Sequence, residues 1–161
     1  MMNKTREEAV WKRVMAESAQ TPEPEQKPKQ ESCQTERQVM ELLEQEAKDA
    51  CTYQTLACRV KGEARRTLMQ LSREEKEHYR KLEAVYYVMT GRRPCVDRPK
   101  APCVACLNEE LRRRYDMEIQ GAALYHKLAQ TAGSFAGVLH CLHHAEERHA
   151  KTVLCLLEKC L

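Results

Sequence analysis

Two stretches of the chain, "EAKDACTYQTLA" at 46–57 and "EIQGAALYHKLA" at 118–129, share one register. In each, a Glu precedes a Tyr by seven positions, and Leu-Ala begins three residues after the Tyr. The stretch "EKEH" (75–78) follows the first, and "EERH" (146–149) follows the second at nearly the same distance. The chain therefore contains an internal repeat, with an offset of 72 residues in the first part of each copy and 71 in the second.

Apolar residues around the repeat are spaced as in amphipathic helices. They recur at three- and four-residue steps, which predicts helix rather than strand. We expect an all-α fold with four long helices at about 34–61, 63–90, 107–131 and 134–160. Short turns at Gly62 and Gly133 would make each copy of the repeat an antiparallel helical hairpin.

The connection between the two hairpins, "GRRPCVDRPKAPC" at 91–103, is long and contains three prolines. Fully extended, it covers roughly 40 Å at ~3.3 Å per residue. A helix of about 27 residues is also roughly 40 Å long. The connection can therefore run the length of a bundle and join two parallel helices, which predicts an up-down-down-up order over 34–161.

The N-terminal region differs from the rest of the chain. We expect residues 1–19 to form a short amphipathic helix that carries Trp11 and can dock on a partner or a neighbouring subunit. Residues 20–33 contain three prolines and no large apolar side chain, which predicts an extended linker.

Composition excludes several classes of protein. Charged residues make up 32% of the 161 positions, and the formal charge is only +3 because both signs are interspersed. We therefore expect no nucleic-acid partner. No apolar run approaches the ~20 residues of a membrane span, and the N-terminus lacks a signal core. Nine cysteines within helical patterns indicate free thiols in the cytoplasm rather than a disulfide framework.

The register of the repeat decides how its Glu and His residues are interpreted. Two Glu-x-x-His pairs alone would more often be a solvated helix face. However, Glu46 lies two helical turns before Tyr53, on the face that carries the apolar stripe, and Glu118 lies in the same way before Tyr125. Both carboxylates are therefore predicted to be buried, which is costly without a partner.

Cations would remove this cost. One Glu from each of two helices plus Glu-x-x-His from each of the other two is a recurring ligand set for two metal ions. Oxygen-rich ligation with some imidazole suits iron, or alternatively manganese, better than zinc. The predicted metal ligands are Glu46, Glu75, His78, Glu118, Glu146 and His149.

With these residues and the Tyr and Leu-Ala register, residues 36–160 resemble the rubrerythrin family of the ferritin-like superfamily. The resemblance implies a ferritin-like four-helix bundle with a carboxylate-bridged di-iron centre. It also implies work on hydrogen peroxide or dioxygen in defence against oxidants.

The chain departs from the family pattern in two places. Rubrerythrins often carry a second domain with a Cys₄ iron site, whereas only one Cys-x-x-Cys pair, Cys103 and Cys106, is present. We therefore expect a separate electron-donor protein. Gly121 stands where the family usually has a further Glu. Asp49, at the mirrored position, either supplies this carboxylate or is a solvated helix residue.

Other residues have alternative interpretations. Tyr53 and Tyr125 either orient the ligands by hydrogen bonding or pack in the core. His140, His143 and His144 can bind a metal or be exposed, and we expect His126 to face solvent. The helical cysteines are expected to be small buried hydrophobes. They are Cys51, Cys58, Cys141 and Cys155. Cys95, Cys103 and Cys106 form an incomplete zinc set.

Three functions are compatible with the sequence. The first is a di-iron peroxidase or ferroxidase, the second is a non-catalytic iron-handling protein, and the third is a structural helical bundle. A homodimer is compatible with all three.

Overall fold

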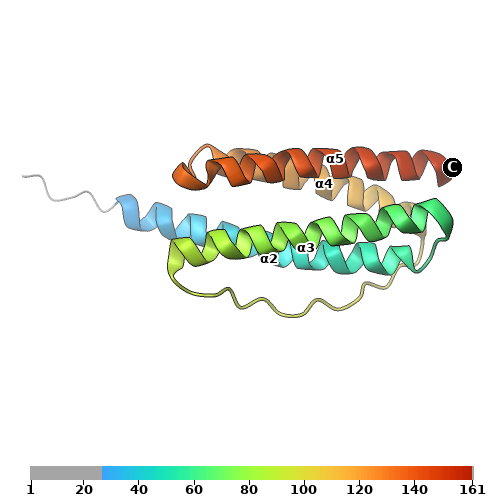
Figure 1. The fold of residues 1–161 in the computed structure, drawn as a ribbon, viewed down its shortest axis with the longest axis horizontal. Helices are drawn as coiled ribbons and strands as arrows, with labels where there is room; N and C mark the ends of the chain where they lie inside the picture. Colours follow the sequence, from blue (N-terminus) through green and yellow to red (C-terminus); the bar gives the residue numbers. More distant parts are fainter. Residues whose placement is uncertain (1–26, 161) are drawn as a thin grey trace, which may run out of the picture. The chain divides into compact units, whose positions relative to one another are not determined.

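A computed structural model describes the backbone of residues 27–160 and the side chains of 34–159. The described residues from Gln34 onward form one compact unit. The elements are α2 (Lys27–Ala57), α3 (Gly62–Thr90), α4 (Leu107–Ala129), the 3₁₀ turn η1 (Gly133–Phe135) and α5 (Ala136–Cys160). Over the described range the fold is all-α, with four long helices in a helical bundle (Figure 1).

The first long helix begins earlier than the sequence predicts. Helix α2 starts at Lys27, inside the segment 20–33 that we expected to be an extended linker. The only proline in its first turn is Pro28, and proline is tolerated there because the first turn needs no amide hydrogen bond. The helix expected at 1–19 and the linker residues 20–26 lie outside the described residues.

The predicted helix ends are close to those observed. Helix α3 stops at Gly91, which has φ +69° and donates its backbone N–H to the carbonyl of Tyr87. Left-handed backbone of this kind favours glycine. Helix α2 ends at Ala57, a few residues before the expected position, and Gly62 with φ +62° starts α3.

Contacts between helices fix the directions in which they run. Helix α3 is antiparallel to α2, because Ser72 bonds to the Ala50 carbonyl while Tyr86 bonds to Glu36. Helix α4 is also antiparallel to α2, because Tyr53 bonds to Glu118 and Tyr125 bonds to Glu46. Helices α3 and α4 are therefore parallel (Figure 1).

The connection at 91–106 follows α2 along its length (Figure 1). Arg92 pairs with Glu36 near one end, and Arg59 donates to the Val104 carbonyl near the other. The parallel direction of α3 and α4 therefore agrees with the length argument.

Two apolar clusters enclose a polar layer. One cluster contains Leu43, Leu82, Tyr125 and Leu142, and each helix contributes to it. The other is again built from all four helices and contains Tyr53, Leu68, Leu111 and Val153. Along each helix the residues between these clusters are the predicted ligands. Burial of each large apolar side chain stabilises the fold by about 1.5–3 kcal/mol, and the two clusters together can offset the cost of a polar layer.

The expectation of buried helical cysteines is wrong for three of the four. Cys58, Cys141 and Cys155 are exposed, and Cys51 is half-buried. Cys58 lies just past the end of α2, and the other two lie on the outer face of α5. The seven cysteines between 51 and 155 are free thiols.

No helix among the described residues combines the length and the apolar character needed to cross a membrane.

Candidate metal centre

Each long helix contributes at least one buried carboxylate to the polar layer. The six predicted ligands are all 5% exposed or less, although charged side chains are rarely buried to this extent without partners. They are Glu46 on α2, Glu75 and His78 on α3, Glu118 on α4, and Glu146 and His149 on α5.

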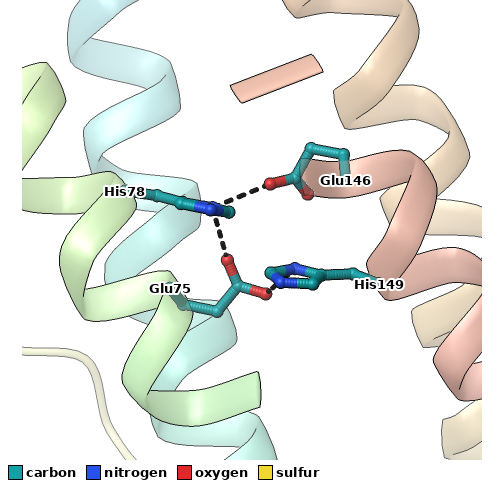
Figure 2. A group of neighbouring side chains, drawn as sticks. All are labelled: Glu75, His78, Glu146 and His149. Carbon is teal, nitrogen blue, oxygen red and sulfur yellow. Dashed lines mark ion pairs between the residues drawn. The ribbon is translucent and has the colours of Figure 1, made fainter. Parts of the chain in front are cut away.

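His78 faces three carboxylates. Its Nδ1 lies 2.8 Å from Oε1 of Glu146, 3.0 Å from Oε2 of Glu75 and 3.4 Å from Oε2 of Glu46. Figure 2 shows the imidazole pointing between Glu75 of its own helix and Glu146 of α5. Residues three apart lie on one side of a helix, so α3 supplies both members of the pair.

His149 occupies the corresponding place on α5. Its Nδ1 lies 3.0 Å from Oε1 of Glu75 and 3.6 Å from Oε2 of Glu118. Glu75 therefore contacts both imidazoles, one with each carboxylate oxygen (Figure 2). The two rings are stacked, with centroids 5.1 Å apart.

Glu74 fixes the orientation of His149 from outside the group. The Nε2 atom of His149 lies 2.7 Å from Oε2 of Glu74. Because a carboxylate accepts a hydrogen bond, Nε2 donates its proton there, and Nδ1 faces the centre. An outer carboxylate of this kind usually accompanies a metal-bound histidine.

The side chains of the centre shift one another's pKa values. Burial opposes protonation of His78, but the carboxylates led by Glu146 raise its pKa to about 12. Burial likewise opposes protonation of His149, but Glu118 and Glu75 together raise its pKa to about 11. Burial raises the pKa of Glu46 to about 8. Burial also favours protonation of Glu75, but the two imidazoles lower its pKa to about 2.

These pKa values indicate that a bound cation would take the place of protons on the two imidazoles. Without a cation, protons on the two imidazoles would have to offset the charge of the carboxylates. Since metal ligands must be deprotonated, binding of a cation would release these protons.

The polar atoms of the centre fit a metal ion. Every one of the six residues has at least one buried side-chain atom without a hydrogen-bond partner. Buried polar atoms normally have one. Ligand atoms of Glu75, His78, Glu146 and His149 lie within 4.8 Å of one another, and this group can hold a metal ion.

The two tyrosines bond across the bundle. Tyr53 donates to Glu118, and Tyr125 donates to Glu46. Burial, followed by the charge of the bonded Glu, raises the pKa of each phenol well above its usual value. Each phenol therefore remains protonated and orients one carboxylate oxygen, leaving the other toward the centre.

Asp49 is buried, so the alternative that it is a solvated helix residue is wrong. It forms an ion pair with Arg114, and Gln45 donates to both of its oxygens at 2.9 Å. Burial lowers the pKa of Arg114. At the mirrored position, a Cβ on Gly121 would lie 3.4 Å from Oε2 of Glu146, so Glu146 lies against the space that a side chain would otherwise occupy.

The sequence patterns did not predict the roles of Glu74 and Arg114. Both lie in runs of charged residues, where a surface position is the usual expectation, and their repeat counterparts Ala145 and Leu42 are apolar. The available signal for Arg114 was its spacing of four residues before Glu118, which puts it on the buried face.

The remaining candidates lie outside this centre. His126, His140 and His144 are exposed and His143 is half-buried, at the α4–α5 side of the bundle. Cys95, Cys103 and Cys106 are exposed. No cysteine belongs to either of the two groups of potential metal ligands among the described residues.

Comparisons of the chain with models of protein families, with curated proteins and with solved structures find no match.

Proposed function

We propose that the buried centre binds two metal ions and that the chain is a rubrerythrin-like protein with a ferritin-like bundle. The observation that carries this proposal is the convergence of four Glu and two His in the core, with an unpartnered buried atom on each. The repeat assigns Glu46 and Glu118 to opposite sides of the centre, while Glu75 contacts both imidazoles. Such a set provides for two cations and a carboxylate between them.

Iron is the proposed metal, with manganese as the alternative. Four carboxylates and two imidazoles form a ligand set richer in oxygen than most zinc sites. A pair of iron ions supplies one-electron redox changes, so a reduced pair can provide the two electrons that convert hydrogen peroxide, with two protons, into two waters.

A cavity beside the centre supports access by a small oxidant. It has a volume of about 560 Å³ and lies between α2, α3 and the 91–106 connection. Glu46 lines it together with Lys76, Tyr79 and Arg80. A small neutral molecule such as peroxide or dioxygen can enter this space and reach a ligand of the proposed metal pair.

The supporting residues have separate roles in this proposal. Tyr53 and Tyr125 hold Glu118 and Glu46 in position. Asp49 would be the carboxylate that moves toward the metal pair, and its ion pair with Arg114 would hold it until then. The electrons come from a separate donor protein, and the protein acts in the cytoplasm in defence against oxidants. In this proposal the N-terminal segment 1–19 docks on a partner or a neighbouring subunit.

Reaction with oxidants tests the proposal. We expect the protein, loaded with Fe²⁺ without oxygen, to be oxidised faster by hydrogen peroxide than by dioxygen in stopped-flow absorbance measurements. Asp49→Asn should slow the peroxide reaction about tenfold or more, as when a single positioned group is lost, while metal content stays nearly unchanged. Asp116→Asn, a change of the same kind on the exposed face of α4, is the matched control.

Each other outcome selects a different function. Faster reaction with dioxygen would favour a ferroxidase. A loaded protein that reacts with neither oxidant would be a non-catalytic iron-handling protein, and a protein that binds no metal would be a structural bundle.

A further inference from the structure

A second group of potential ligands lies on the surface of the same bundle, outside the six buried residues. It consists of His126 on α4 and His140, His143, His144 and Glu147 on α5. Positions 140, 143, 144 and 147 follow the three- and four-residue spacing that aligns side chains on one helix face. We refer to these five residues as the surface histidine cluster.

The imidazoles of this cluster lie close together. The ring centroid of His143 is 5.1 Å from that of His126 and 4.8 Å from that of His144. His140 is more distant and approaches only His126, at 6.0 Å between ring centroids. The cluster therefore brings imidazoles from two helices together. An ordinary surface ion pair would need only one histidine and one carboxylate.

His143 is oriented as a metal ligand would be. Its Nδ1 lies 2.9 Å from the backbone carbonyl of Ala122. A carbonyl can only accept, so Nδ1 donates to it and Nε2 is the ring atom left to bind a metal. This Nε2 points toward Glu147, with 3.8 Å to Oε1. A backbone carbonyl that fixes the tautomer in this way is a common outer partner of a metal-bound histidine.

Glu147 joins the two adjacent histidines. Its Oε2 lies 3.1 Å from Nδ1 of His144. One ligand atom each from His143, His144 and Glu147 lie within 4.8 Å of one another. These distances allow one ion to contact all three residues after small side-chain rotations, because the side chains of His144 and Glu147 are 65% and 46% exposed and can adjust.

We propose that four residues of the surface histidine cluster, all but His140, bind one divalent transition-metal ion, with Zn²⁺ as the best-suited ion. His143, His144 and Glu147 are three ligands. Exposed His126, whose ring centroid lies 5.1 Å from that of His143, can rotate to provide the fourth from α4. A nitrogen-rich set with one carboxylate and four-coordinate geometry suits zinc. The buried centre is oxygen-rich, so the two sites would select different metals. This inference does not depend on the proposed function of the buried centre.

Zinc titration by isothermal calorimetry tests this inference on the full chain, after its resident metal content has been measured. We expect one Zn²⁺ event per chain that His143→Ala/His144→Ala weakens more than about tenfold, because loss of even an outer partner of a ligand weakens metal binding about 10- to 100-fold. His140→Ala is the matched control, since it removes a histidine from the same face and keeps all four proposed ligands. Its zinc affinity should remain within about twofold of the parent.

Two further variants separate this site from the buried one. Glu75→Ala alters the buried centre and should leave the surface Zn²⁺ event unchanged. His144→Gln, at an exposed position, serves as the ligand variant if the double variant does not fold, and it should also weaken binding about tenfold. The proposal is overturned if the ligand variants bind Zn²⁺ as the parent does, or if the event disappears in Glu75→Ala.

Discussion

The two helical hairpins supply the same predicted ligands to the centre, but they surround them differently. Glu46 corresponds to Glu118, and the Glu75–His78 pair corresponds to Glu146 and His149. All of these side chains are buried in one layer. The residues next to them do not follow the repeat. Glu74 supports His149, whereas the equivalent residue on α5 is Ala145 and supplies no carboxylate to His78.

A second difference lies between the α2 side and the α4 side of the buried polar layer. The α2 side has Asp49 where the α4 side has Gly121, and the Arg114 that pairs with Asp49 corresponds to Leu42. The α2–α3 side also carries the cavity beside Glu46. The repeat therefore sets the ligands in equivalent positions, while its unequal neighbours make the two proposed metal positions chemically distinct. Variants that remove one difference at a time test this interpretation.

The largest expected effect comes from the Asp49–Arg114 pair. Arg114→Leu gives α4 the leucine that α2 has at the equivalent position, Leu42. It leaves the Asp49 carboxylate buried without its cation. Breaking a buried pair in this way costs about 3–5 kcal/mol. We expect this loss in the free energy of unfolding of the metal-free protein, measured with urea.

The double variant Asp49→Ala/Arg114→Leu makes the hairpins more alike and should recover most of that loss, because neither charge remains buried. Arg112→Leu, at an exposed position on the same helix, should change stability by less than about 0.5 kcal/mol. A double variant as unstable as Arg114→Leu would show that the pair is not the source of the effect.

An intermediate effect is expected from the two corresponding carboxylates Glu75 and Glu146. Glu75 contacts both imidazoles, whereas Glu146 contacts only His78. Glu75→Ala should therefore lose at least one metal ion per chain and more metal than Glu146→Ala, by elemental analysis.

After loading with metal, each variant should be less stable than the loaded parent, and the variant that has lost more metal should be the less stable of the two. A ligand present at 100 times its Kd stabilises the folded state by about 2.7 kcal/mol, which corresponds to a Tm lower by roughly 5–10 °C for a chain of this size. Glu77→Ala on the exposed face of α3 is the control. Metal content equal to that of the parent in both variants would contradict the assignment of these carboxylates as ligands.

The smallest effect is expected from Glu74. Glu74→Gln keeps the size of the side chain and weakens the hydrogen bond that orients His149. Loss of such an outer partner lowers metal affinity about 10- to 100-fold, and we expect the lower end because an amide oxygen can still accept from Nε2. Competition with a chelator of known affinity measures the change. An unchanged affinity would show that His149 is positioned by packing alone.

The sequence predicted the four helices and the burial of the six Glu and His residues because both depend on spacing along single helices. The register of Glu46 with Tyr53, for example, is sufficient to put both on one face. Contacts between helices could not be predicted in the same way. The pairing of Asp49 with Arg114, 65 residues apart, and that of His149 with Glu74 depend on how the helices rotate against each other.

The early start of α2 and the exposed cysteines show a similar limit. Three prolines suggested an extended linker at 20–33, but Pro28 lies in the first turn of α2, where proline is compatible with helix. Cysteine is apolar enough to be buried, so its residue type alone did not reveal that Cys141 and Cys155 lie on the outer face of α5.

The central claim is that the six buried residues hold two metal ions. The most direct test is elemental analysis of the protein purified without oxygen and loaded with Fe²⁺, with the surface histidine cluster removed by His143→Ala/His144→Ala. We expect about two iron ions per chain, as the dinuclear ligand set requires. Glu75→Ala in the same background should hold fewer. A folded protein that retains no metal after removal of excess ion, or one with the same iron content with and without Glu75, would contradict the claim.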